Sequence, residues 1–182
     1  MKTDRRVART RRTLREALLA LTYERGWEQV SVQDVCARAD VGRSTFYAHF
    51  ADKEELLTSG FQDLRSALRA RAGEADGRPL ASVHALLAHL DENRRLHRAL
   101  VGERVGRVVH ARFRRLLHDI VAEDLAALVP DPRRRDHAVR YVAGGLYELL
   151  VAWVDARAPE TAEEMAETVR GLTLAVVRAA GG

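Results

Sequence analysis

Residues 31–57 of the chain read SVQDVCARADVGRSTFYAHFADKEELL, a stretch in which two helix starts lie close together. Ser31 stands three residues before Asp34. This is the spacing of a capping box, whose serine side chain satisfies a free backbone amide at the start of a helix. Residues 40–42 interrupt the helical pattern, and residues 43–50 form a second short helical segment. The stretch therefore predicts two short helices joined by a tight turn.

A longer helix precedes this pair and ends at Gly26. Its residues Leu14, Leu18 and Leu21 have i, i+4, i+7 spacing, which places them on one face. Three helices of which the last two are joined by a tight turn have the layout of a helix-turn-helix. Apolar groups on the inner faces of the short helices would complete its small core: Val35, Ala39, Val41, Phe46 and Phe50.

The outer face of the second short helix carries polar side chains suited to DNA: Arg43, Ser44, Thr45, Tyr47 and His49. An arginine near the start of such a helix can donate two hydrogen bonds to a guanine in the major groove. Tyr47 is better placed for phosphates, as is Lys53 at the start of the next helix, and phosphate contacts fix register rather than sequence. The pattern predicts a surface that reads DNA.

These residues resemble the TetR family of bacterial regulators, from about Arg11 to Leu57. The densest part of the resemblance is Ser44-Thr-Phe-Tyr-Ala-His-Phe50 followed by Asp52-Lys-Glu-Glu-Leu56. The resemblance implies a three-helix DNA-binding domain and a helical C-terminal domain that binds a small molecule and dimerises. The DNA contacts that it implies are Arg43, Ser44, Thr45, Tyr47 and His49 on the recognition helix, Ser31 beside a phosphate, and Lys53 on the DNA backbone.

Two positions depart from the family pattern. Asp40 stands in the turn where the family usually has glycine, and aspartate tolerates a left-handed backbone better than most residues. Gly42 stands where the recognition helix usually has a Ser or Thr cap. Glycine is an acceptable N-cap, although it brings no side-chain acceptor. Both departures are compatible with the predicted fold.

Positive charge is concentrated at the N-terminus. Residues 1–50 hold ten Lys or Arg and six Asp or Glu, so their excess of four equals the net charge of +4 of the whole chain. A basic front on a neutral body suggests that the front meets a polyanion. Residues 1–12 form a particularly basic arm, for which two interpretations stay open. The arm contacts phosphates or an adjacent minor groove, or it is a solubilising tail.

The rest of the chain has helical periodicity, and no strand pattern of convincing length occurs. The helix that begins at Asp52 is expected to run to about Ala72, and Asp131-Pro132 and Thr161-Ala-Glu-Glu164 are further helix starts. The predicted fold class is all-α with about nine helices. We expect a helix-turn-helix domain with a basic arm at residues 1–55 and a larger effector-binding and dimerisation domain at residues 56–182.

The larger domain resembles a TetR-like C-terminal subgroup in residues 92–100, 141–153 and 161–166. In this family the last two helices form the dimer surface, and residues 137–154 are apolar on more than one face. A pocket for an unknown small-molecule effector is expected among the middle helices. Its candidate lining residues are Leu86, Leu90, Leu100, Phe113, Leu117, Tyr141, Gly145 and Glu148.

The sequence therefore predicts a homodimeric repressor that binds a palindromic double-stranded operator and is released by a small-molecule effector. One alternative keeps the DNA-binding domain and makes the body a dimerisation or protein-interaction module without an effector. Activation instead of repression is a further alternative, which the position of the operator relative to the promoter would decide.

Other functions and sites are not expected. The single cysteine, Cys36, excludes an intramolecular disulfide and a zinc site with several cysteines. The pairs His84/His89 and His110/His118 lack i+3 or i+4 spacing, so we expect no metal site and no cofactor. No nucleophile elbow, phosphate loop or dinucleotide fingerprint suggests an enzyme. No apolar run is long enough to span a bilayer, which predicts a cytoplasmic protein without a membrane partner.

Overall fold

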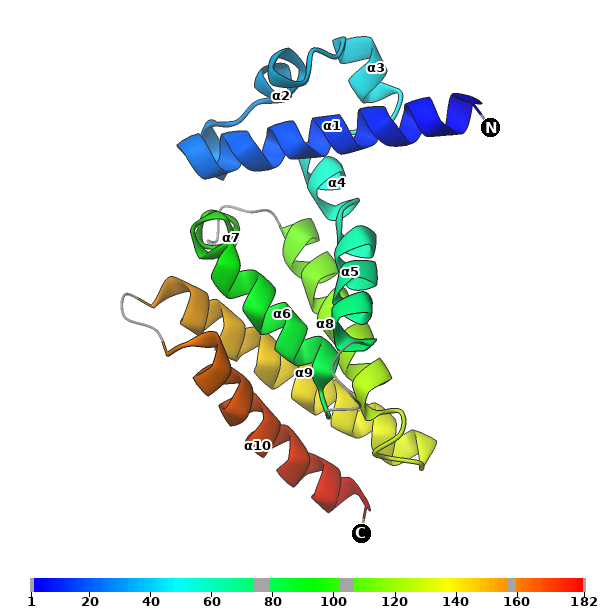
Figure 1. Cartoon of the computed structure of the whole chain (residues 1–182), viewed down its shortest axis with the longest axis vertical. Coiled ribbons are helices and arrows are strands. Elements are labelled where there is room, and N and C mark those ends of the chain that lie inside the picture. The colour runs from blue at the N-terminus through cyan, green and yellow to red at the C-terminus, as the bar shows by residue number, and fades with distance from the viewer. Residues whose placement is uncertain (1, 74–78, 102–106, 157–159, 182) are drawn as a thin grey trace. The chain divides into compact units, whose positions relative to one another are not determined.

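A computed structural model describes residues 2–73, 79–101, 107–156 and 160–181 (Figure 1). Within these ranges the chain is all-α, as predicted, with ten α-helices and one short 3-10 helix. The sequence pattern predicts a loop from Gly73 to Pro79 and a weak helical region bracketed by Gly102 and Gly106, and residues 74–78 and 102–106 lie outside the described residues. The elements are α1 (Lys2–Arg25), η1 (Trp27–Gln29), α2 (Val32–Ala39), α3 (Arg43–Tyr47), α4 (Lys53–Thr58), α5 (Phe61–Gly73), α6 (Ala81–Glu92), α7 (Arg94–Val101), α8 (Arg107–Leu125), α9 (Pro132–Asp155) and α10 (Ala162–Gly181).

The helices form two compact units. Unit 1 comprises Met1–Gln62 and Arg95–His110, and unit 2 comprises Asp63–Arg94 and Ala111–Gly182. The second segment belongs to unit 1 for a physical reason, because Val109 is buried in the core of that unit and Leu100 packs against it. The Arg95 guanidinium also lies over the ring of Tyr23 in α1, 4.5 Å from its centroid. The core of unit 1 therefore draws on residues far apart in the sequence.

Unit 1 is built around α1, along which α2 and α3 lie on one side (Figure 1). The predicted inner face of α1 is buried, with Leu14, Leu18 and Leu21 at most 1% exposed. Phe46 and Phe50 complete this core and are at most 2% exposed. Burying side chains of this size stabilises a small unit by roughly 1.5–3 kcal/mol each. These anchors hold helices that are too short to be stable alone.

Two segments of unit 1 differ from the prediction. The basic arm is not separate from the first helix, because α1 already begins at Lys2. The helix expected from Asp52 to about Ala72 is interrupted between Thr58 and Phe61, so that prediction of one continuous helix was wrong. At the break, a Cβ on Gly60 would lie 2.9 Å from Cδ of Arg15, so glycine here allows α1 to approach closely.

Unit 2 contains α5, α6, α9, α10 and most of α8. In Figure 1, α10 runs antiparallel beside α9, and it also packs against α6. The predicted helix starts are present: the Asp131 side chain accepts a hydrogen bond from the Arg134 amide, and Thr161 and Glu164 form a reciprocal capping box. Arg65 forms ion pairs with Asp119 and Glu123, which tie α5 to α8.

A carboxylate from α8 accepts a hydrogen bond from a backbone amide at the start of α6. Leu80, which precedes α6, has a left-handed backbone with φ 62° and provides no side-chain cap. Oδ2 of Asp124 instead accepts a hydrogen bond from the Val83 amide, at 3.2 Å. Burial raises the pKa of Asp124 above its ordinary value, against the opposing effect of hydrogen bonds from Ser82 and from the Val83 amide.

We expect Asp124→Asn to change how stability depends on pH. A carboxyl group with a raised folded-state pKa stabilises the fold most when protonated, and this contribution is lost as pH rises through the folded-state pKa. The free energy of unfolding of the wild type, minus that of Asp124→Asn, should therefore decrease from near pH 3.8, the ordinary aspartate value, toward neutrality. Urea unfolding of both proteins, at one fixed protein concentration and at a series of pH values, measures this difference. A difference that rises with pH would contradict the role given to burial.

Candidate nucleic-acid interface

The helix α3 divides into a buried side and an exposed side. Phe46 is fully buried, and its ring packs edge-on against Tyr47 and at a tilt against Phe50. Arg43, Ser44 and Thr45 are exposed, as is Tyr47 at 51%. His49, just beyond the end of α3, is half-buried, and its ring lies near that of Phe50. One side of a five-residue helix thus anchors it while the other presents hydrogen-bonding groups to solvent.

The turn before α3 accommodates both departures from the family pattern. Asp40 adopts a left-handed backbone, with φ 52° and ψ 47°, which aspartate tolerates. The Val41 amide then donates to the carbonyl of Cys36 at 3.0 Å, which closes the end of α2. Gly42 caps α3 without a side-chain bond, and its carbonyl accepts from the Phe46 amide at 3.0 Å. The turn therefore forms without a glycine at position 40.

The start of α2 carries the predicted capping box. The Ser31 hydroxyl accepts from the Asp34 amide at 3.1 Å, and Oδ2 of Asp34 accepts from the Ser31 amide at 2.9 Å. These bonds with Ser31, aided by the charge of Arg25, hold the pKa of Asp34 below its ordinary value. Ser31 itself is exposed. Its hydroxyl lies at the positive end of the α2 dipole, where an anion such as phosphate is favoured.

Lys53 lies differently from the other residues expected at the DNA. Its Nζ donates to the carbonyls of Trp27 and Val30, both at 2.9 Å. It also stands 4.4 Å from the centroid of the Trp27 ring. Lys53 is half-buried, so its charge is largely engaged within unit 1.

The first turns of α1 carry exposed arginines. Arg5, Arg6 and Arg9 are exposed, and none of the described ion pairs involves them. Farther along, the Arg11 guanidinium lies 5.0 Å from the centroid of the Phe50 ring, while Arg12 pairs with Glu16 at 3.6 Å. Because these arginines are on a helix and not on a flexible arm, the helical backbone fixes their relative positions.

The eight residues expected to line an effector pocket are spread over several environments. Leu86, Leu90 and Leu117 are at most 2% exposed in the core of unit 2, whereas Leu100 packs against the core of unit 1. Phe113 is half-buried, and its ring lies 6.2 Å from that of Tyr147. The remaining three are exposed: Tyr141, Gly145 and Glu148. Neither of the two hollows described below gathers all eight.

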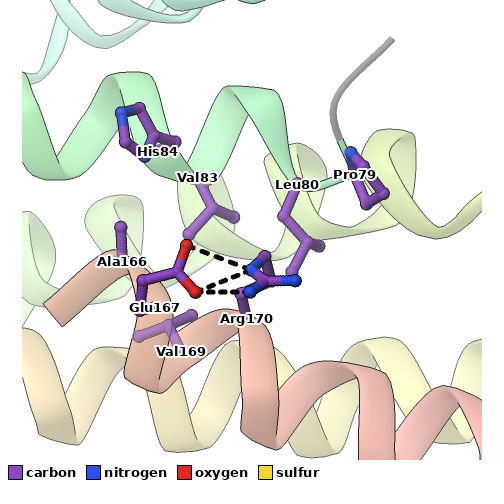
Figure 2. A pocket seen from close by; sticks show the side chains of 8 residues that line it. All are labelled: Pro79, Leu80, Val83, His84, Ala166, Glu167, Val169 and Arg170. Carbon is purple, nitrogen blue, oxygen red and sulfur yellow. Dashed lines mark hydrogen bonds and ion pairs between the residues drawn. The ribbon is translucent and has the colours of Figure 1, made fainter. Parts of the chain in front are cut away.

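A small hollow lies where the start of α6 meets α10. Figure 2 shows its lining, with His84 and Val83 on one side and the ion pair of Glu167 with Arg170 on the other. Its volume is about 20 Å³, which suits about one water molecule. The hollow is too small for an organic effector.

A larger, open groove lies between α9 and α10, with a volume of about 540 Å³. Two large apolar side chains stand exposed at it, Tyr141 at 73% and Leu172 at 56%. Leu172 has helical spacing with Val169 and Val176, but periodicity alone does not show that part of this apolar face of α10 is exposed to solvent. The lining is Tyr141, Val142, Gly145, Leu146, Leu149, Val169, Leu172, Thr173, Ala175 and Val176.

Metal ligands and the single thiol are the remaining groups that could form a site. No group of three or more His, Cys, Asp or Glu side chains in the described ranges is arranged to hold a metal ion. Cys36 is a buried free thiol, and burial raises its pKa despite the opposing charge of Arg43. In the same ranges, no helix has a long enough apolar stretch to cross a bilayer.

Comparison with known sequences identifies two family regions. Residues 14–59 match the family of bacterial regulatory proteins called the tetR family, and residues 78–174 match a transcriptional regulator C-terminal region. An uncharacterised helix-turn-helix-type transcriptional regulator of Bacillus subtilis, YxbF, is 40% identical over 60 residues. That match covers 32% of this chain and only 16% of the length of YxbF.

Solved structures agree over nearly the whole chain. A TetR transcriptional regulator from Streptococcus agalactiae is 26% identical, with a TM-score of 0.68 and coverage of 95% of this chain and 98% of its own. FadR of Thermus thermophilus, a TetR-family repressor solved with lauroyl-CoA, is 23% identical, with a TM-score of 0.65 and coverage of 90% and 93%. The matches in both regions, together with the helix-turn-helix around α3, show that this chain belongs to the TetR family of bacterial transcriptional regulators.

Proposed function

We propose that the protein is a homodimeric repressor that binds a near-palindromic operator and is released from it by a small-molecule effector. The observation that carries the DNA-binding part is the division of α3 into a buried Phe46 side and an exposed polar side. Two such helices, one from each subunit, would occupy successive major grooves. Operator symmetry would then mirror the symmetry of the dimer.

The exposed residues of α3 have distinct roles in this proposal. Arg43 at the start of the helix donates to a guanine edge, since its planar fork suits bidentate bonds to guanine. Ser44, Thr45 and His49 contribute shorter bonds to bases or phosphates. Tyr47 and Ser31 hold phosphates and so fix the register of the helix in the groove.

The basic start of α1 supplies further phosphate contacts. Arg5, Arg6 and Arg9 carry charge on a rigid helix and have no carboxylate among their described partners. The salt dependence of binding distinguishes this interpretation from the other one, in which the segment only increases solubility. The slope of log affinity against log salt concentration is negative, and removing one phosphate contact reduces its magnitude by about 0.9. A truncation that leaves this slope unchanged would assign the arm to solubility.

The groove between α9 and α10 is the proposed dimer surface. Monomeric proteins rarely leave large contiguous apolar surface exposed, and Tyr141 and Leu172 stand open on adjacent helices. Gly144 and Gly145 lie on the exposed side of α9, and no atom lies within 4 Å of a Cβ built at either position. Small residues on this face would let the helices of a second copy approach closely.

Effector release requires two states of the dimer. An effector lowers DNA affinity only if it binds the state that cannot engage both half-sites more tightly than the DNA-binding state. FadR, a protein of the same fold, binds lauroyl-CoA. The rival proposal, a body that serves only for dimerisation or protein contacts, is supported by the open groove at α9 and α10. A compound that releases the operator at micromolar concentration would exclude the rival.

The first test is selection of binding sites from random duplex DNA at near-physiological salt. We expect recovery of a near-palindrome with half-sites about one helical turn apart or somewhat more. Recovery of no motif, with only salt-sensitive bulk binding, would mean that α3 does not read bases.

Replacement of Arg43 by Ala tests the base-reading role. Affinity for the selected operator should fall by about 1–3 kcal/mol, and specificity should relax at one position of each half-site. Arg170→Ala, which removes an exposed arginine from α10, is the matched control and should bind the operator like the wild type. A uniform loss on all DNA sequences would instead make Arg43 a phosphate contact.

Leu172→Asp tests the dimer surface. A charge in an apolar interface is costly, so the variant should sediment as a monomer at micromolar concentration, where the wild type is a dimer. Because Leu172 is exposed within the subunit, its replacement should leave the helical content intact. Tyr23→Asp, at a site in unit 1 that is exposed to 48%, is the control and should stay dimeric. A dimeric Leu172→Asp protein would place the interface elsewhere.

A further inference from the structure

Lys53 connects the segments on either side of the helix-turn-helix. The carbonyls that it binds, on Trp27 and Val30, belong to the segment that leads from α1 into α2. Lys53 itself is the first residue of α4, after the chain has left α3. One ammonium group therefore joins the two ends of the pair α2 and α3.

Both sides of this connection are rigid. Trp27 and Val30 are at most 3% exposed, so their carbonyls are fixed by the core around them. On the other side, the Asp52 side chain accepts from the Glu55 amide at 2.7 Å, and the Glu55 side chain accepts from the Ala51 amide at 2.7 Å. The ammonium consequently spans two fixed supports rather than resting on a mobile loop.

The same geometry limits what Lys53 can offer to DNA. An ammonium group has three N–H donors and no acceptor, and two of these donors are used by the carbonyls. Its charge also faces the Trp27 ring, where a cation–π contact stabilises it by about 0.5–2 kcal/mol. A phosphate contact that keeps both carbonyl bonds has only the third donor to use.

We propose that Lys53 is a positioning residue that fixes the orientation of α2 and α3, rather than the DNA-backbone contact that the family resemblance implies. The inference rests on the proposed DNA binding by α3. The recognition helix has only five residues, so its direction depends on supports at the ends of the pair. With this connection absent, α3 would remain folded around Phe46 but would meet the major groove with a broader range of orientations.

Lys53→Met tests the proposal, because the methionine keeps an apolar stem beside Trp27 and removes the charge and all N–H donors of the side chain. Binding is measured to the selected operator and to a scrambled duplex of the same length, over a range of salt concentrations. We expect the operator affinity to fall about tenfold, because a misoriented reading helix makes fewer bonds to bases. Affinity for the scrambled duplex and the salt slope of operator binding should stay at the wild-type values. Arg170→Met, a neutralised arginine in unit 2, controls for the loss of one charge.

A phosphate contact gives the opposite pattern. Loss of a phosphate-binding lysine weakens binding to both duplexes alike and lowers the salt slope by about 0.9. That result would overturn the positioning role. Amide hydrogen exchange of the folded protein without DNA supplies a second measurement. Exchange in α2 and in residues 40–42 should be faster in Lys53→Met, while exchange in the middle of α1 should not change. Unchanged exchange in α2 and the turn would also overturn the proposal.

The two hypotheses fail separately. Should the wild type select no DNA motif, the proposed operator binding fails, and hydrogen exchange still tests whether Lys53 holds α2 and α3. Should Lys53→Met not fold, Lys53→Gln replaces it, because its amide group retains N–H donors for a backbone carbonyl without the charge. Under the positioning role, the loss of operator affinity in Lys53→Gln should exceed the loss in the control Arg170→Met by at most a few-fold. A reduced salt slope in Lys53→Gln would again assign Lys53 to a phosphate.

Discussion

The burial of Phe46 is the constraint on which the DNA-binding surface depends. A five-residue helix cannot offset the cost of its own nucleation, so α3 exists only because its one large apolar side chain fills the core of unit 1. The same packing decides which residues face outward. Once Phe46 is buried, Arg43, Ser44, Thr45 and Tyr47 are left in solvent. The packing of α3 and its proposed DNA contacts therefore use opposite sides of the same short helix.

Local signals made much of unit 1 predictable from the sequence. The capping box of Ser31 and Asp34, the cap at Asp52 and the apolar spacing of Leu14, Leu18 and Leu21 each depend on residues within one or two turns, and each is present. The exposed set on α3 follows from the same periodicity.

What the sequence could not predict depends on contacts between distant residues. The partners of Lys53 lie 23 and 26 positions away, and no periodic pattern indicates that an ammonium will bind the carbonyls of Trp27 and Val30. The break at Gly60 was missed because Ser59 and Gly60 are tolerated within helices. A Cβ at Gly60 would lie 2.9 Å from Cδ of Arg15, a distant residue that local spacing does not indicate. The candidate pocket residues were chosen by polarity and spacing, which cannot distinguish a core leucine such as Leu117 from the groove residue Tyr141.

The chain joins the two units at several points rather than through one linker. The chain passes between the two units after Gln62, after Arg94 and after His110. At the second passage two consecutive arginines are held by aromatic rings, Arg94 over Trp153 in unit 2 and Arg95 over Tyr23 in unit 1. Arg94 also donates to the Trp153 carbonyl at 2.7 Å. Because Arg94 and Arg95 are adjacent, a single peptide bond joins a residue packed on α9 to one packed on α1.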